Sequence, residues 1–250
     1  MEVLLKHGAW VDVTEMGSCS EKYTCLHLAC LWGDMEMIRL LVKYKADMTA
    51  YNEVRESPFT IAYDEGNKEA IDLFLEHGID LNDNQSSIML GENREHIPVK
   101  NMWTPLMHAC ARNDTKMVKR LLAHGADVNV ASQSPPHDDY EYTTAVLESI
   151  DKEEILQILL DHGDDVNLTD ALGNTPLLTL VKPQEDVYSS RDDFDTEDPD
   201  LLEGVRMLLE RGLDLMHEDN EGKTAFDYVE EESEMEALLM EYRDRKPAQK

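Results

Sequence analysis

The sequence predicts an all-α protein in which a pair of short helices is repeated along the chain. A seven-residue string recurs five times, as HGAWVDV (7–13), HGIDLND (77–83), HGADVNV (124–130), HGDDVNL (162–168) and RGLDLMH (211–217). An amphipathic segment precedes the glycine of each copy, and a second apolar segment follows after a hydroxyl residue. Repetition at this scale is typical of arrays of small supersecondary units.

The segments before the glycines predict the second helix of each pair. They are MEVLLKHG (1–8), EAIDLFLEHG (69–78), KMVKRLLAHG (116–125), EEILQILLDHG (153–163) and GVRMLLERG (204–212). Apolar residues recur every three or four positions, as on one face of a helix. Glycine then ends the helix, because it adopts the left-handed conformation without steric cost. A sixth segment, MEMIRLLVKYKADM (35–48), carries Lys45 at this position, and we expect that lysine to be mildly strained.

The segments that begin with a hydroxyl residue predict the first helix of each pair. They are TCLHLAC, SPFTIAY, TPLMHAC, TAVLESI, TPLLTLV and TAFDYVE, opening at Thr24, Ser57, Thr104, Thr144, Thr175 and Thr224. A hydroxyl residue caps a helix, and the proline that often follows is tolerated in the first turn. One such pair cannot bury its apolar faces alone, so neighbouring pairs must stack.

The TPLH-like and HGADVN-like strings resemble those of the ankyrin repeat family. Thr24 to Lys45 is 21 residues and Lys45 to Ser57 is 12, which together give the 33-residue ankyrin period. The resemblance covers essentially the whole chain. It implies an ankyrin-repeat solenoid with β-hairpin fingers, containing six repeats plus an N-terminal half-repeat, as a single domain over residues 1–250. Because the chain opens in the middle of a helix, it is either a fragment of a longer array or begins with a half-repeat cap.

The spacing departs from this period at three fingers and at one other connection. The loops at 84–103 and 132–142 are enlarged fingers, and a smaller insertion lies at Met16–Tyr23. Loops on one edge commonly carry recognition, although neutral drift is the alternative for any single loop. A further insertion at 184–203 has nine acidic residues and one basic residue, so we expect it to be disordered.

Composition disfavours several functional classes. There are 53 acidic and 23 basic residues, a net charge of −30, which disfavours nucleic acid and anionic membrane and favours basic partners. The four cysteines lack zinc spacing and are typical of reduced thiols in an intracellular protein, cytoplasmic or nuclear. The histidines before the glycines and His27 fit structural positions, so we expect no catalytic residues, no metal and no cofactor. Asn129 and Asn167 resemble substrates of asparaginyl hydroxylation in other ankyrin proteins, but an unmodified structural role is better supported.

The resemblance implies a non-enzymatic scaffold that binds a protein on the concave surface formed by fingers and first helices. The candidate contact residues are Tyr23, Leu31, Trp32, Glu56, Trp103, Arg112, Tyr140 and Tyr142. Tryptophan, tyrosine and arginine are the types most often found at binding hot spots. We expect a protein partner with a basic or mixed face, and a monomeric chain. The alternatives are an autoinhibitory or targeting module of a larger protein and, less favoured, part of an enzyme.

Overall fold

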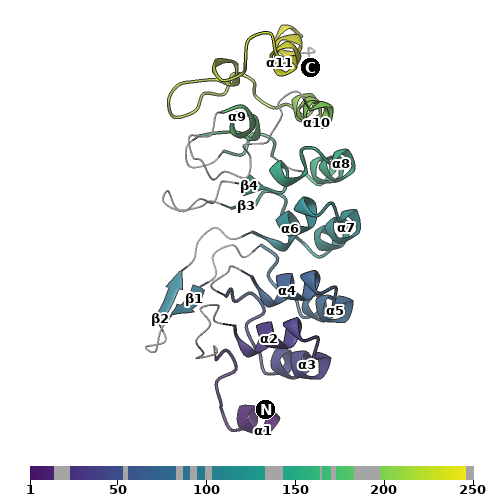
Figure 1. Ribbon diagram of the computed structural model, residues 1–250, viewed down its shortest axis with the longest axis vertical. Helices are drawn as coiled ribbons and strands as arrows, with labels where there is room; N and C mark the ends of the chain where they lie inside the picture. The colour runs from purple at the N-terminus through teal and green to yellow at the C-terminus, as the bar shows by residue number, and fades with distance from the viewer. Residues whose placement is uncertain are drawn as a thin grey trace. The chain divides into compact units, whose positions relative to one another are not determined.

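The computed structural model describes residues 1–13, 23–52, 56–82, 87–90, 95–98, 103–132, 143–163, 165–169, 173–182 and 198–245. For 87–90 and 95–98 it describes the backbone alone. The described chain is mostly helical, as predicted, and it divides into two compact units, Met1–Pro105 and Leu106–Lys250 (Figure 1).

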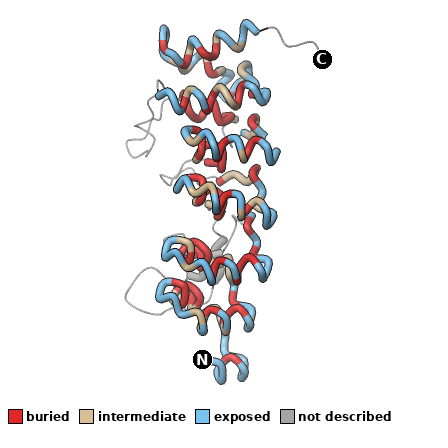
Figure 2. The backbone as a smooth tube through the Cα atoms, turned by 90° about the vertical axis from the view of Figure 1, so that its right-hand side faces the viewer, coloured by how far each residue is buried: buried red, intermediate tan, exposed pale blue. Residues whose placement is uncertain are grey.

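The first unit is built from stacked helical pairs. Its helices are α1 (Glu2–Lys6), α2 (Cys25–Leu31), α3 (Met35–Lys43), α4 (Pro58–Asp64) and α5 (Lys68–Glu76). Within each pair the first helix packs on the second, α2 on α3 and α4 on α5; between pairs, α2 packs on α4 and α3 on α5. Figure 2 shows buried residues along both helices of each pair, so the core lies between them.

A two-stranded antiparallel hairpin also belongs to the first unit. Strand β1 (Ser87–Leu90) pairs with β2 (Glu95–Pro98), with Ile88 opposite Ile97. Both strands fall inside the enlarged finger predicted at 84–103. The described part of that finger is therefore a β-hairpin, as the ankyrin resemblance implies.

The second unit repeats the same arrangement with more variation. Its elements are α6 (Pro105–Ala111), α7 (Thr115–Ala123), β3 (Ala131–Ser132), β4 (Thr143–Thr144), η1 (Leu147–Ser149), α8 (Glu153–Asp161), α9 (Pro176–Val181), α10 (Pro199–Glu210), η2 (Ala225–Asp227) and α11 (Glu234–Asp244), where η marks a 3₁₀-helix. Helix α7 packs on α8, α8 on α10 and α10 on α11. Strands β3 and β4 pair at the two ends of the predicted finger 132–142, of which residues 133–142 lie outside the described chain.

Side-chain caps determine where the helices begin. The Thr24, Ser57 and Thr175 hydroxyls accept hydrogen bonds from the backbone N–H three residues on, at the starts of α2, α4 and α9. Asp34 and Asn67 cap α3 and α5 in the same way. Such caps satisfy backbone donors that the helix itself leaves unpaired.

The left-handed residue predicted after each second helix is confirmed. The glycines have φ values of 83° at Gly8, 68° at Gly78, 89° at Gly125, 94° at Gly163 and 95° at Gly212. Lys45 takes the same conformation, with φ of 61°, although lysine has a Cβ that glycine lacks. The histidine before each of four glycines binds back to the carbonyl four residues earlier, for example His7 Nδ1 to Val3 O at 2.7 Å.

Two predicted first helices are shorter than expected. TAVLESI and TAFDYVE form the 3₁₀-helices η1 and η2 rather than α-helices. In η1, the Ser149 hydroxyl donates to the carbonyls of Ala145 and Val146, at 2.9 and 3.1 Å, which competes with regular helical bonding.

Helix α10 begins before the end of the predicted disordered insertion. Residues 199–203 form its first turns, so the expectation of disorder is wrong for that part of 184–203, and residues 183–197 lie outside the described chain. The reason is that this acidic segment contains residues that favour the start of a helix. Asp198 caps the helix, accepting from Asp200 N–H at 2.8 Å, and Pro199 occupies the first turn.

A close contact fixes α10 in the second unit. Gly204 lies so near the backbone of Ile150 that an added Cβ would stand 1.9 Å from the Ile150 carbonyl oxygen. No larger residue fits there unless the backbone moves. The glycine is therefore required by packing and not by its dihedral angles.

Candidate protein-interaction surface

Trp32 and Leu31 present apolar surface at the end of α2. Trp32 is the C-cap residue of that helix and is 73% exposed, while Leu31 is 39% exposed. The Trp32 backbone is fixed, because its N–H donates to Leu28 O at 3.0 Å and Gly33 follows with φ of 67°. These two predicted contact residues therefore form an exposed apolar pair on a rigid backbone.

His27 connects two other predicted residues, Tyr23 and Glu56. The Tyr23 ring stands edge-on to the His27 ring, with centroids 6.0 Å apart. Thr24 N–H donates to His27 Nδ1 at 3.1 Å, so Nε2 carries the proton and donates to the Glu56 carbonyl at 3.0 Å. His27 is fully buried, and burial lowers its pKa from 6.5 to about 4. A neutral histidine thus joins neighbouring repeats beneath the surface.

Glu56 and Trp103 are engaged through neighbouring side chains. Asn52 accepts from Glu56 N–H at 2.8 Å and donates to the Glu56 carboxylate at 3.1 Å. The Tyr51 hydroxyl donates to Trp103 O at 3.3 Å. Glu56 and Trp103 are half-buried, so each is a less accessible contact than Trp32.

The remaining predicted residues lie elsewhere. Arg112 is exposed and follows α6 in the second unit. Tyr140 and Tyr142 lie outside the described residues. The structure therefore gathers Tyr23, Leu31, Trp32, Glu56 and Trp103 in the first unit, with Trp32 as the most exposed of them.

The described chain offers little for covalent or metal chemistry. Within the ranges that the structure describes, no group of three or more His, Cys, Asp or Glu residues could hold a metal ion. Burial raises the pKa of the Cys30 thiol to about 12 and also raises that of Cys25, which disfavours the reactive thiolate. None of the helices described here has the length and apolar character to cross a membrane.

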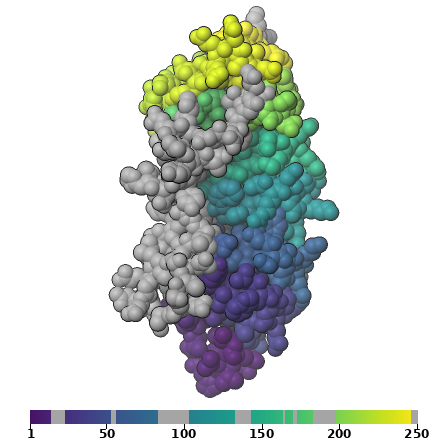
Figure 3. All heavy atoms as spheres, in the orientation of Figure 1, coloured from purple at the N-terminus to yellow at the C-terminus, as the bar shows by residue number. Residues whose placement is uncertain are grey.

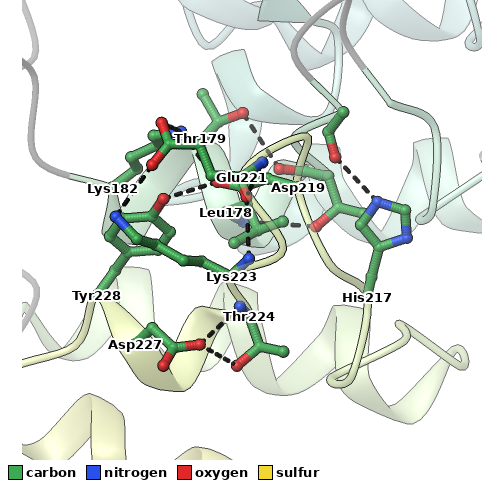
Figure 4. A network of polar contacts seen from close by, with 12 residues as sticks. Leu178, Thr179, Lys182, His217, Asp219, Glu221, Lys223, Thr224, Asp227 and Tyr228 are labelled. Atoms are coloured by element: carbon green, nitrogen blue, oxygen red, sulfur yellow. Dashed lines mark hydrogen bonds and ion pairs between the residues drawn. The ribbon is translucent and has the colours of Figure 1, made fainter.

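A polar network centred on the buried Asp219 occupies the last finger of the second unit (Figure 4). Asp219 is its centre: its carboxylate accepts from the Tyr228 hydroxyl at 2.7 Å and pairs with Lys182 at 2.9 Å. The same carboxylate accepts from the backbone N–H groups of Glu221 and Lys223. The Tyr228 and Lys182 bonds hold the pKa of Asp219 well below its usual range. These hydrogen-bond and ion-pair partners of Asp219 all belong to the protein itself, which indicates a structural role.

Sequence reasoning did not identify the residues that hold the fingers in place. Asn52 stands five residues before Ser57, as Asp219 stands five before Thr224, and both close the finger onto its own backbone. That shared spacing was visible in the sequence. Their burial was not, because it depends on the neighbouring repeat.

The asparagines of the repeated string join neighbouring repeats. Asn129 accepts from Asp165 N–H at 2.7 Å and donates to Gly163 O at 3.3 Å. Asn167 makes the same pair of bonds to Asp214 N–H and Gly212 O. These contacts are those of a structural asparagine, the role favoured on sequence grounds.

Comparison with known proteins identifies the family. The profile described as ankyrin repeats (3 copies) matches residues 1–85, 51–132 and 86–170, which together are more than half of the chain. The chain belongs to the ankyrin repeat family. This confirms the resemblance drawn from the TPLH-like and HGADVN-like strings.

Sequence identity to individual ankyrin repeat proteins is about 30%. Human ankyrin repeat and SOCS box protein 6 is 31% identical over 188 residues, 74% of this chain and 38% of that protein. The mouse B-cell lymphoma 3 protein homolog is 27% identical over 162 residues, 62% of this chain and 32% of that protein. The chain thus spans less than two fifths of the length of these relatives.

Solved ankyrin repeat domains share the fold. The human ASB11 ankyrin repeat domain has a TM-score of 0.56 and 18% identity, covering 99% of this chain and 93% of that one. An ankyrin repeat domain from Acinetobacter baumannii has a TM-score of 0.56 and 21% identity, covering 87% and 97%. At these identities the likeness concerns the fold alone.

Proposed function

We propose that this ankyrin repeat protein binds a protein partner non-covalently, through the surface at the end of α2. The observation that carries the proposal is Trp32, a large aromatic side chain that is 73% exposed. Exposed tryptophans on a fixed backbone are typical anchors of protein interfaces. Ankyrin repeats generally mediate protein–protein interaction, and this surface is where the present chain offers an anchor.

The rigidity of the support favours binding. Trp32 follows a helix that begins at the Thr24 cap and carries the buried His27 in its first turn. A partner would order few side chains on binding, so less of the interaction energy is lost as entropy. Leu31, the preceding residue, is also exposed and adds apolar surface beside the anchor.

The partner face is expected to be basic or mixed. Asp64 and Glu65 occupy, at the end of α4, the positions that Leu31 and Trp32 occupy in α2. Both carboxylates are exposed, and α2 packs directly on α4. A partner bearing lysine or arginine beside an apolar group would complement an aromatic anchor next to acidic residues.

The thiols favour an intracellular setting. Cys25 and Cys30 are free cysteines, and Cys30 and Cys110 are fully buried as small apolar residues. Secreted proteins more often oxidise such residues into disulfides. We infer a cytoplasmic or nuclear monomer.

The proposal is tested by replacing the anchor. Wild-type chain is used to capture proteins from cell extract, and each retained partner is purified and titrated against both wild type and Trp32→Ala. Loss of a central aromatic anchor should weaken affinity about tenfold or more. Because Trp32 is exposed, the free energy of unfolding should change by no more than about 0.5 kcal/mol.

Met216→Ala is the matched control, since Met216 is another large exposed apolar residue, in the second unit. It should leave affinity unchanged. Equal affinity of Trp32→Ala and wild type for every purified partner would overturn the assignment. Weaker association at higher salt, mainly through a slower on-rate, would support the basic face.

A further inference from the structure

The last residue of the enlarged finger 84–103 is held by a side chain from the finger before it. The Tyr51 hydroxyl donates to Trp103 O at 3.3 Å, and the Tyr51 side chain is buried, at 6% exposure. Tyr51 precedes the pair α4 and α5, and Trp103 follows it. The hydrogen bond therefore joins the finger on one side of this helical pair to the finger on the other side.

The finger that ends at Glu56 shows how such an end is held one repeat earlier. Its carbonyl oxygen accepts from Nε2 of His27 at 3.0 Å, so this bond comes from the first helix of the preceding pair. Asn52, in the same finger, binds the N–H and the carboxylate of Glu56. Two residue types, a histidine and an asparagine, thus hold this finger end.

Neither residue type is repeated for the enlarged finger. Thr60 is the third residue of α4, as His27 is the third residue of α2, and its hydroxyl donates within its own helical turn, to Ser57 O at 2.9 Å. Val99 stands five residues before the next cap, where the earlier finger has Asn52, and valine has no polar side-chain group. The end of the enlarged finger therefore depends on a bond of another kind.

We infer that Tyr51 is the residue that positions the end of the enlarged finger, its hydroxyl replacing the donor that histidine supplies one repeat earlier. Tyrosine suits this role because its ring can be buried while its hydroxyl bonds to a partner. The residues at the same place in the other strings, six after the left-handed residue, are Thr14, Asn84, Ala131, Thr169 and Glu218. An aromatic residue thus stands at this place only in the repeat that precedes the enlarged finger.

The second unit shows that finger ends in this protein are held by varied means. At the finger 132–142, strands β3 and β4 pair through their backbones. His217 Nε2 donates to Gly173 O at 2.9 Å, near the end of the next finger, and Asp219 accepts from Lys223 N–H at 3.1 Å in the last one. Because different groups serve at equivalent places, an exchange of histidine for tyrosine fits the rest of the array.

The position of Trp103 matters because this residue is a candidate contact residue. The neighbouring helical pairs of the first unit, violet and blue in Figure 3, are in direct contact, so a finger end bonded across them is fixed to the packed repeats. A partner that touched Trp103 would then order its side chain but not its backbone, and less interaction energy would be lost as entropy. The inference concerns the finger end and does not rest on the Trp32 surface.

The test uses the full chain with Trp10→Phe and Trp32→Phe, which leaves Trp103 as the one tryptophan of three. Tyr51→Phe then removes the hydroxyl and keeps the ring. The fluorescence of Trp103 should shift to longer wavelength and its anisotropy should fall, because a released indole is more hydrated and more mobile. Hydrogen exchange at residues 103–107 should become about fivefold faster, as expected for the loss of one hydrogen bond, while exchange in α4 and α5 stays unchanged.

Tyr44→Phe is the matched control, because it removes a tyrosine hydroxyl at the end of α3, and it should change neither measurement. Unchanged fluorescence and exchange in Tyr51→Phe would overturn the inference. An equal acceleration of exchange throughout α4 and α5 would also overturn it, because Tyr51 would then act as an ordinary core residue.

A rescue variant tests the replacement of histidine directly. Tyr51→Ser with Thr60→His supplies the residue types that the preceding repeat has at Ser18 and His27, and it should restore slow exchange at residues 103–107 at pH 7. A folded rescue variant that keeps fast exchange there would overturn the equivalence of Tyr51 and histidine. Where the rescue variant loses its helical circular dichroism, Tyr51→Phe alone decides.

Discussion

Lys45 is a lysine in a position that the rest of the array reserves for glycine. Its φ of 61° places a Cβ in the left-handed region, where L residues are strained. Helix α3 still ends at this left-handed position, although lysine is less suited to the conformation than glycine. The strain at this single residue therefore lowers the free energy of unfolding by a small amount.

Replacing Lys45 by glycine should raise the free energy of unfolding by about 0.5–1 kcal/mol, since glycine adopts this conformation without strain. Urea unfolding followed by circular dichroism measures it. Lys43→Gly, two residues earlier and inside α3, is the control and should destabilise by about 1 kcal/mol. A lower stability for Lys45→Gly would contradict the role of strain.

His27 makes stability depend on pH. Its pKa is about 4 in the folded chain against 6.5 unperturbed, so between these values the unfolded state binds more protons. Stability from this group is present above pH 6.5 and is lost as pH falls through about 4. The slope is about 1.4 kcal/mol per pH unit within the window.

His27→Gln should flatten this pH dependence, whatever its effect on stability at pH 7, because glutamine does not titrate. Urea unfolding at several pH values between about 4.5 and 7 measures the slope. His124→Gln, which removes an exposed histidine, should keep the wild-type slope. Equal slopes for His27→Gln and wild type would show that other groups cause the loss at low pH.

At the scale of elements, the packing of α10 depends on a missing side chain. Glycine weakens a helix interior by about 1 kcal/mol relative to alanine. Gly204 is nevertheless required, because the Ile150 carbonyl occupies the place of a Cβ. Packing between elements outweighs local helix propensity at this position.

Gly204→Ala should therefore lower the free energy of unfolding by about 1–3 kcal/mol, the usual cost of overpacking, despite the gain in helix propensity. Thermal and urea unfolding measure the change. Glu203→Ala, at the adjacent exposed position, should alter stability by no more than about 0.5 kcal/mol. A more stable Gly204→Ala would show that the helix can shift away without loss.

The two hydrogen bonds from Asn167 to the following repeat give a second prediction at this scale. Asn167→Ala removes an acceptor for Asp214 N–H and a donor to Gly212 O, and should cost about 1 kcal/mol. Asn167→Asp keeps the acceptor, as Asp12 does for Asp47 N–H, and should cost less. Denaturant unfolding of both variants measures the difference. Equal losses would assign the stabilisation to the donor alone.

The sequence predicted the elements better than their exact extents. Periodic apolar residues and left-handed glycines located the second helices, because both signals are local. The start of α10 was not predicted, because the capping residue Asp198 is one of many acidic residues in that segment. The 3₁₀ form of η1 was not predicted either, because the bonds from the Ser149 hydroxyl to backbone carbonyls depend on the folded structure. Of the candidate contact residues, Leu31 and Trp32 are exposed, and their contact with a partner stays a prediction. The bond from His27 to the Glu56 carbonyl depends on an adjacent repeat, which local pattern does not show.

At the scale of the whole molecule, charge is the dominant feature. A net charge of −30 on 250 residues opposes compaction by self-repulsion, and the described ion pairs are mostly exposed and individually weak. Salt should screen the repulsion more than it weakens the pairs.

We therefore expect the midpoint of thermal unfolding to rise between about 20 mM and about 300 mM NaCl. Differential scanning calorimetry measures it, with the same ionic strength of sodium sulfate as a comparison. Because sulfate also strengthens burial of apolar surface, it should raise the midpoint further. A midpoint that falls with NaCl would show that attractive pairs outweigh the repulsion.

The asparagine joints have a consequence for how such a chain can grow. Asn129 and Asn167 each bind backbone groups of the following repeat, at the left-handed glycine and the residue two positions after it. The binding side chain and the backbone it binds are both encoded in the same seven-residue string. An added copy of the string would therefore carry both the asparagine and the backbone groups that form these hydrogen bonds, and its neighbour would need no compensating change. Strings similar to HGADVNV recur along the chain, and at Asn129 and Asn167 each supplies a side chain that contacts the next string.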